Sequence, residues 1–402
     1  MFVFGFLGLL ALGVATILLF PFGIYAPDLE RAFSAAVARP VSLQKIHVDL
    51  YPEPALVLGK VQIGRNDDAI RIGEIRLHPD FKSLFSERRE LRKVVVSGTQ
   101  LQLERITGMP SIFAALAKPD DSPGIGFILL KNTDISFSGI ALRNADAEIQ
   151  RDSAGNMQAL TARSADGSVI LEARPTATAI DLAVEAYAWS FDADSRFVSD
   201  SLSFKGHLEK DTLMISGLEI RALDGLIQGD AIVHAGGAKP NLSGSVVFER
   251  INASRLSEAL GIGRKLDGVI MGSVRFSANS DTWPAIFSSI DGEGEFSIQR
   301  GSLNGIDLAE AARRRVSGVP VQGGTTNFEQ MSGKVRLGRE KNQFYDLDIS
   351  SGLMRSTGQI DIGMDGRLTG QLELQMKGSV NQTRVPVLVS GTLFAPTLQA
   401  GR

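Results

Sequence analysis

Apolar and polar residues alternate along most of this chain with the two-residue period of a β-strand. In Gln371–Lys377 (QLELQMK) every second side chain is apolar, which places Leu372, Leu374 and Met376 on one face. The same pattern recurs in stretches that contain Ile70 and Ile72, Ile75 and Leu77, Leu101 and Leu103, Val274 and Phe276, Phe296 and Ile298, Val335 and Leu337, Leu347 and Ile349, and Ile360 and Ile362. This pattern predicts a mainly β protein.

Turn signals lie between several of these stretches. Asp-Gly and Asn-Gly pairs tolerate the positive φ angles of two-residue hairpin turns. Such pairs begin at Asp166, Asp224, Asp267, Asp291, Asn304 and Asp365. Short turns between successive strands predict a long antiparallel meander.

The beginning of the chain differs from the rest because residues 1–27 contain no charged side chain. Phe2–Phe22 is about as long as a bilayer crossing requires. No basic residue precedes this stretch and its end is a poor cleavage sequence, so a retained transmembrane anchor is favoured over a cleaved signal peptide. Basic residues after the anchor favour a cytoplasmic body only weakly, because long domains translocate largely regardless of flanking charge. Pattern alone leaves the orientation open.

Few segments have the character of helices. A helix is expected from Pro27 to the residue before Pro40, and a short one within Pro110–Ala117. Asn252, Asp281 and Asp307 can each cap a short helix. So few helices cannot cover a sheet of this size, so the sheet must fold onto itself as a sandwich or barrel, or curl into an open groove with an apolar wall.

The predicted organisation has four parts. Pro and Asp residues in Lys118–Gly124 mark a seam in an otherwise continuous β body. The parts are a transmembrane anchor over 1–27, an N-terminal β unit with short helices over 28–118, a central β-groove region over 119–287 and a C-terminal region over 288–402.

Composition narrows the chemistry. The net charge of −3 gives no basic field, so no nucleic-acid partner is expected. The absence of cysteine excludes disulfides, thiol catalysis and cysteine-based zinc sites. No cofactor or metal is expected.

Catalytic motifs are missing from the sequence. His47, His78, His207 and His234 stand apart, without metal-ligand spacing, and we interpret them as surface or sheet-face residues. Neither a nucleophile elbow nor a phosphate-binding loop occurs. The chain is therefore not expected to be an enzyme.

Arg313, Arg314 and Arg315 follow an alanine-rich stretch at the end of a short predicted helix. Positive charge at that position complements the helix dipole. The alternative is contact with lipid phosphates, which arginine can hold through two hydrogen bonds.

Two stretches resemble the AsmA family, one within residues 34–104 and a stronger one within 288–402. The similar pieces are Ala38–Val41, Leu50–Leu56, Val94–Leu101, Gly292–Gly301, Asn304–Leu308, Gly323–Phe328 and Gly391–Pro396. The resemblance implies a single-pass protein of the cell inner membrane, with its body in the periplasm and a role in outer-membrane biogenesis. It also implies kinship with bridge-like lipid transfer proteins built from repeating β-groove units, and it transfers no catalytic residues.

These observations lead to the hypothesis that the protein binds phospholipid and conducts or chaperones it along a hydrophobic β groove. Arg313, Arg314 and Arg315 are the headgroup candidates. The acyl-chain candidates are Leu101, Leu103, Phe296, Ile298, Val335, Leu337, Leu372, Leu374 and Met376.

Two alternatives stay open. A structural or regulatory scaffold would influence the assembly or targeting of outer-membrane proteins, with other envelope proteins as partners and no lipid transport. A membrane-tethered hydrolase would need a pocket that joins one of the four histidines to a serine and a carboxylate.

Overall fold

The structure is a computed structural model that describes residues 22–37, 40–64, 70–83, 90–102, 125–137, 140–152, 156–190, 196–234, 239–282, 285–314, 319–352, 354–377 and 382–401. Most of the predicted anchor lies outside these residues. Among the helices within them, none has the length and apolar character needed to cross a bilayer.

The chain forms two compact units, Met1–Ala183 (unit 1) and Val184–Arg402 (unit 2). The division falls within β10 (Ile180–Ser190). It does not coincide with the predicted divisions after residues 118 and 287, and the predicted seam at 118–124 lies outside the described residues.

Within the described residues, unit 1 is a sheet on which helix α2 packs. Its elements are η1 (Phe22–Tyr25), α2 (Ala26–Val37), β1 (Val41–Ser42), β2 (Lys45–Asp49), β3 (Ala55–Ile63), β4 (Ile70–Pro79), β5 (Leu91–Gln102), β6 (Ile125–Phe137), β7 (Ile140–Arg151), β8 (Met157–Arg163) and β9 (Val169–Pro175). β1 and β2 pair with β3, and each strand from β3 to β9 pairs with the next. Leu29 and Phe33 of α2 pack on a core that contains Leu58 and Ile72.

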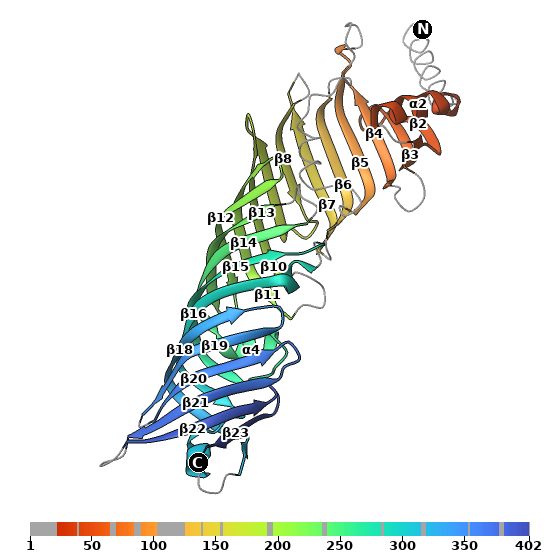
Figure 1. The fold of residues 1–402 in the computed structure, drawn as a ribbon. Coiled ribbons are helices and arrows are strands. Elements are labelled where there is room, and N and C mark those ends of the chain that lie inside the picture. Colours follow the sequence, from red (N-terminus) through yellow and green to blue (C-terminus); the bar gives the residue numbers. More distant parts are fainter. Residues whose placement is uncertain are drawn as a thin grey trace, which may run out of the picture. The chain divides into compact units, whose positions relative to one another are not determined.

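Unit 2 continues in the same style (Figure 1). After β10 its elements are β11 (Val198–Glu209), β12 (Thr212–Ala222), β13 (Gly225–His234), β14 (Asn241–Asn252), α4 (Ala253–Ala259), β15 (Leu266–Asn279), η6 (Phe287–Ser289), β16 (Ile290–Asn304), α5 (Leu308–Arg313), β17 (Val321–Gln322), β18 (Thr325–Leu337), β19 (Lys341–Ser351), β20 (Met354–Gly363), β21 (Leu368–Lys377), β22 (Gln382–Gly391) and β23 (Pro396–Ala400). Successive long strands from β11 to β23 pair antiparallel.

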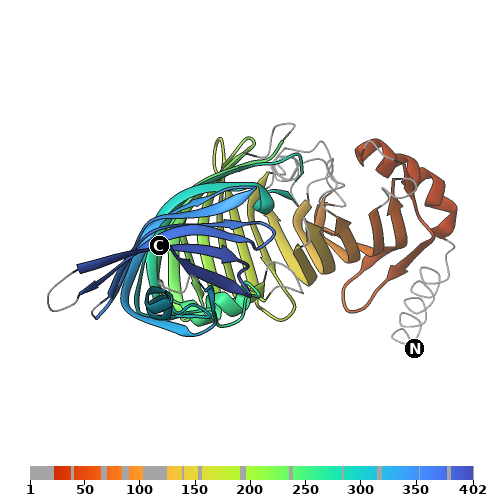
Figure 2. The same ribbon diagram turned by 60° about the horizontal axis from the view of Figure 1, so that its bottom comes forward.

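The last strand of unit 2 returns to an earlier part of the sheet. β23 pairs on one side with β22 and on the other with β17, which precedes β18 in the chain by only two residues. α5 contacts β18, β22 and β23. Figure 2 shows the bent strands of this unit from its C-terminal end.

The mainly β prediction is confirmed, and so is the meander, with one exception. β5 and β6 are parallel neighbours. Parallel neighbours need a crossover of a dozen or more residues, and the segment between them, 103–124, has that length.

Not every turn signal lies in a turn. Asp267 and Asp291 lie inside β15 and β16. Gly268, with φ of 124°, instead marks a register shift between those two strands. In this chain an Asp-Gly pair therefore marks either a hairpin turn or a register shift within a strand.

Two of the three predicted helix caps are confirmed. Asn252 caps α4 and Asp307 caps α5, as expected. The helix expected after Asp281 is only the single 3₁₀ turn η6 in the described residues. The helix predicted within 110–117 lies outside them.

Strands of unit 2 bend where one strand carries an extra residue. Arg250, Arg300 and Asp346 have φ between 48° and 55°, and each lies at a register shift. Such bulges bend a strand and increase its twist.

Glycine allows neighbouring backbones to approach closely on one face of this sheet. A Cβ added at Gly272 would lie 2.2 Å from the carbonyl oxygen of Glu295 and 2.7 Å from Cζ of Phe248. Only a residue without a side chain fits at this position.

Gly272→Ala should therefore lower the free energy of unfolding of the full chain by about 1–3 kcal/mol, because the methyl group forces strands apart. Gly217→Ala is the control: no atom lies within 4 Å, so its cost is only that of the left-handed conformation, about 1 kcal/mol. Urea unfolding in detergent measures both. A Gly272→Ala variant as stable as the wild type would contradict the close approach.

His78 was interpreted as a surface or sheet-face residue, but it is buried in unit 1, with 6% of its surface exposed. Its Nδ1 has no hydrogen bond within the described chain and lies 3.6 Å from Oε2 of Glu53. Burial, followed by the charge of Lys93, lowers the pKa of His78 below its usual 6.5. The folded state therefore favours neutral imidazole.

Because the folded pKa of His78 is lowered, the unfolded chain binds the extra proton first as the pH falls. This contribution to stability is complete above about pH 6.5 and is lost as the pH falls below that value. His78→Gln should flatten the pH dependence of unfolding between about pH 7.5 and 5.5 relative to the wild type. Identical slopes for the variant and the wild type would refute this assignment.

Candidate functional site

One face of the unit 2 sheet carries apolar residues in uninterrupted rows across the strands. We call it the apolar face. Its central row is defined by residues that lie directly opposite one another in neighbouring strands. In order, the row is Leu218, Gly229, Val246, Val274, Gly294, Val335, Phe344, Ile360, Gly370, Val389, Leu398 and Val321. Opposite residues share a face, so the central row forms one apolar line from β12 to β17.

A parallel row alternates phenylalanine and glycine. Phe248 lies opposite Gly272, Gly272 opposite Phe296, and Phe296 opposite Gly333. The Phe296 ring also meets the ring of Phe344 edge to face, with centroids 6.0 Å apart. The Phe248 ring occupies space that a side chain at Gly272 would fill, so this part of the apolar face is aromatic.

The exposure of the apolar face changes along the sheet. Val246 and Val274 are half-buried. Leu372 and Leu398, by contrast, are 2% and 1% exposed, and they form one closed core that includes Leu308 of α5. The half-buried stretch from β12 to β16 covers four strand spacings, about 19 Å.

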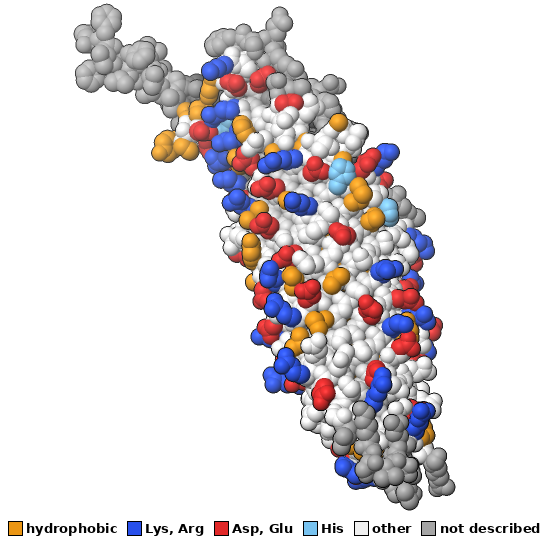
Figure 3. All heavy atoms as spheres, turned by 90° about the vertical axis from the view of Figure 1, so that its left-hand side faces the viewer, with side chains coloured by type: hydrophobic (Ala, Val, Ile, Leu, Met, Phe, Trp, Pro, Cys, Tyr) orange, Lys and Arg blue, Asp and Glu red, His pale blue; other side chains and the backbone are white. Residues whose placement is uncertain are grey.

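The opposite side of the sheet, the charged face, carries ion pairs across the strands. Arg336 Nε lies 2.8 Å from Oε1 of Glu293, and Lys334 Nζ lies 2.9 Å from Oδ2 of Asp346. Both cations also lie over the ring of Tyr345, with Arg336 Cζ 5.7 Å and Lys334 Nζ 6.0 Å from its centroid. Figure 3 shows a face of the molecule on which acidic and basic side chains are interspersed.

The charged face contains a hollow of about 730 Å³ over β15, β16, β18 and β19. Arg275, Lys334 and Arg336 line it together with Asp291, Glu293 and Glu295. The hydrogen bond with Asp346 raises the pKa of Lys334, and that with Glu293 raises the pKa of Arg336. Three acids balance three bases in this lining, so the hollow does not favour an ion of either sign.

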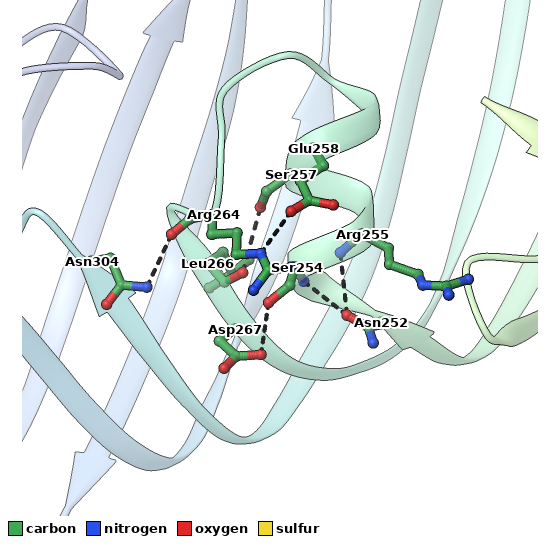
Figure 4. Close-up of polar contacts among 9 residues, drawn as sticks. All are labelled: Asn252, Ser254, Arg255, Ser257, Glu258, Arg264, Leu266, Asp267 and Asn304. Atoms are coloured by element: carbon green, nitrogen blue, oxygen red, sulfur yellow. Dashed lines mark hydrogen bonds and ion pairs between the residues drawn. The ribbon is translucent and has the colours of Figure 1, made fainter. Parts of the chain in front are cut away.

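α4 stands at the end of β14, held by polar contacts at its first turn (Figure 4). Asn252 Oδ1 accepts from the backbone N–H groups of Ser254 and Arg255 at 3.0 and 3.2 Å. Ser254 Oγ donates to Oδ1 of Asp267 at 2.8 Å. These contacts tie the helix to both β14 and β15.

A second set of contacts ties the loop after α4 to β16 (Figure 4). Arg264 Nε donates to Oε1 of Glu258 at 2.6 Å, and Asn304 Nδ2 donates to the carbonyl oxygen of Arg264 at 2.9 Å. Next to it, Lys265 Nζ donates to the carbonyl oxygen of Phe394 at 3.1 Å. The loop thereby joins the start of β15 to the turn before β23.

The predicted acyl-chain residues fall into several environments. Phe296 and Leu337 are half-buried on the apolar face, whereas Met376 is 37% exposed. Leu101 lies in β5, where its side chain is not described, and Leu103 lies outside the described residues. The buried ones are Ile298, Leu372 and Leu374, which belong to the closed core, and Val335.

This placement corrects the prediction that these residues form one accessible stripe along an open groove. The residues from Phe296 to Met376 do share a face, but Leu374 is 0% exposed. The closure follows from the return of β23 to β17, which alternation along single strands does not encode.

The predicted headgroup arginines are partly engaged. Arg313 and Arg314 bind opposite oxygens of Glu310, at 2.8 and 2.6 Å. The hydrogen bonds from Arg314 and then Arg313 lower the pKa of Glu310. Arg315 lies outside the described residues. These contacts fit the prediction that the arginines stabilise the C-terminal end of α5. They leave fewer N–H groups of Arg313 and Arg314 free to bind a phosphate.

Two histidines of the described chain each contact a single carboxylate. His47 contacts Asp49, His78 contacts Glu53 and His234 contacts Thr212, each in a different place. Within the described chain, no group of three or more His, Asp or Glu residues could hold a metal ion.

The half-buried stretch of β14 was missed by the sequence prediction. Its alternation was nevertheless visible, because Leu242, Gly244, Val246 and Phe248 alternate with Ser243, Ser245, Val247 and Glu249. Glycine at one position and an exposed valine at another weaken the pattern.

Comparison with known proteins gives no match, whether with family models, curated proteins or solved structures. The resemblance to the AsmA family therefore stays a prediction from the quoted sequence pieces.

Asn252→Ala should cost about 1 kcal/mol, because it removes the N-cap of α4. Hydrogen exchange of the α4 amides should accelerate accordingly. Asn241→Ala, at the other end of β14, removes only an exposed contact to Asn279 and should change stability by no more than about 0.5 kcal/mol. Unchanged exchange in α4 would show that the cap does not hold the helix.

Proposed function

We propose that this chain is a non-enzymatic, inner-membrane-anchored periplasmic protein of outer-membrane biogenesis that binds phospholipid acyl chains on the apolar face of unit 2. The anchor is residues 1–27. Binding would serve to conduct or chaperone phospholipid, and other envelope proteins would be further partners.

One observation carries this proposal: the central row is apolar at every position, and its Val246 and Val274 are only half-buried. A long apolar surface that stays accessible commonly marks a ligand or membrane site. The charged face also supports the proposal, because it leaves one side of the sheet suited to water and the other side suited to acyl chains.

The energy of such binding needs no polar contact. Burying a methylene group is worth about 0.8 kcal/mol, so a chain of about 16 carbons could gain on the order of 10 kcal/mol. Selectivity among acyl chains would be low, which suits the movement of bulk phospholipid.

A scaffold without lipid transport is the second candidate, and the closed core favours it. Leu372, Leu374 and Val387 are almost fully buried, as in an ordinary packed domain. If the half-buried stretch also binds no lipid, the scaffold accounts better for the fold.

Single cysteines test the proposal, because the natural chain contains none. Val246→Cys and Val247→Cys place the same probe on adjacent residues of opposite faces, the first half-buried on the apolar face and the second, where valine is 50% exposed, on the charged face. Each full-length variant carries an environment-sensitive fluorophore and is mixed with phosphatidylcholine vesicles that contain a lipid with a nitroxide on its acyl chain.

We expect quenching at residue 246 and little at residue 247, because only the apolar face accepts acyl chains. Mass spectrometry should find diacyl lipid on the purified protein, and less of it on Val246→Asp than on Val247→Asp. Equal quenching at both positions, together with a lipid-free preparation, would favour the scaffold.

A further inference from the structure

The closed core of unit 2 ends at a very short ladder. β17 and β23 pair through only Val321–Leu398 and Gln322–Thr397, whereas the β21–β22 ladder continues from Gly370 to Lys377. Few backbone hydrogen bonds hold a seam of this length, and a ladder of two residue pairs opens at a lower free-energy cost than a long one.

The chain next to the seam also permits movement. Gly323 and Gly324, with φ of 77° and 83°, join β17 to β18. Pro396 begins β23 and has no N–H group to give to the ladder. β17 can therefore separate from β23 without breaking the longer ladders.

Opening this seam would lengthen the accessible apolar line. Behind it, Val321, Leu398 and Val389 are 6%, 1% and 1% exposed, and they continue the central row whose other end is half-buried. The row would then be accessible from β12 to β23.

A polar group inside the closed core points to a ligand. Ser356 is 0% exposed, and its Oγ has no hydrogen-bond partner within the described chain. It lies opposite Ile349 on one side and Leu374 on the other, in an otherwise apolar row. A buried hydroxyl without a partner is unfavourable, and an ester carbonyl is an acceptor that an acyl chain would bring with it.

We infer that the closed end of unit 2 is a second binding site for ester-linked diacyl lipid, entered by parting β17 from β23, with Ser356 donating a hydrogen bond to an ester carbonyl. The inference rests on the proposed function. It adds where the lipid goes and which seam controls its entry.

A reversible disulfide across the seam, called the seam staple, tests the entry route. Gln322→Cys with Thr397→Cys places two thiols where the side chains already touch, since Gln322 Nε2 donates to Thr397 Oγ1 at 3.0 Å. Gln371→Cys with Leu388→Cys is the matched control, because this exposed pair lies opposite across the long β21–β22 ladder. Each protein is its own second control when the disulfide is reduced.

The probe is phosphatidylcholine with a diazirine on one acyl chain, and crosslinked residues are mapped by mass spectrometry. Crosslinks to the peptide with Leu372 and Leu374 should be lost on oxidation of the seam staple and return on reduction. The control staple should leave them unchanged. Crosslinks that persist in the oxidised seam variant would overturn the entry route.

Ser356→Ala separates ligand binding from packing. Removing an unpartnered buried hydroxyl should leave the melting temperature of the lipid-free protein unchanged or higher, while crosslinking to Leu374 falls. A purely structural serine would change both in the same direction, which would overturn its assigned role.

Hydrogen exchange without lipid separates this inference from the proposed function. The β23 amides should exchange at least about tenfold faster than those of β22, and the oxidised seam staple should slow them. Rapid exchange with no crosslink anywhere would contradict the proposed function, and with it the lipid at the closed end, while the opening of the seam itself would stand. Crosslinks near Val246 but never near Leu374, with slow β23 exchange, would overturn only the second site.

Discussion

The close approach of neighbouring backbones on the apolar face is the constraint on which unit 2 depends. At Gly272 and Gly294 a Cβ would lie 2.2 Å from a carbonyl oxygen of the next strand, so no side chain can occupy either position. Phenylalanine and valine side chains cover the glycines instead. Together with the left-handed bulges at Arg250 and Arg300, these approaches let the sheet bend toward its apolar face.

That bending gives one surface two environments. From β12 to β16 the central row keeps half-buried side chains, whereas at its far end Val389, Leu398 and Val321 are enclosed in the core that also contains Leu308 of α5. The half-buried part of this sheet favours lipid binding. The closed part favours a structural scaffold. The two differ in whether an acyl chain ever contacts Val246.

The charged face is covered by paired charges. Its acids and bases pair across strands, as Glu293 does with Arg336, and the hollow among them holds equal numbers of each sign. Interspersed charges of this kind discourage association with other sheets. The proposed function therefore depends on the apolar side chains. Its driving force is the burial of hydrocarbon.

Local patterns in the sequence determined the strand content, the meander and the caps at Asn252 and Asp307, because alternation, turn pairs and capping oxygens act over a few residues. They also showed which side chains share a face, as for Leu372 and Leu374. Only the tertiary structure decided that Leu374 is sealed while Val246 is half-buried, that His78 is buried, and that β5 runs parallel to β6. Burial depends on which distant strands meet, and the return of β23 to β17 is such a long-range pairing, without a local signal in either segment.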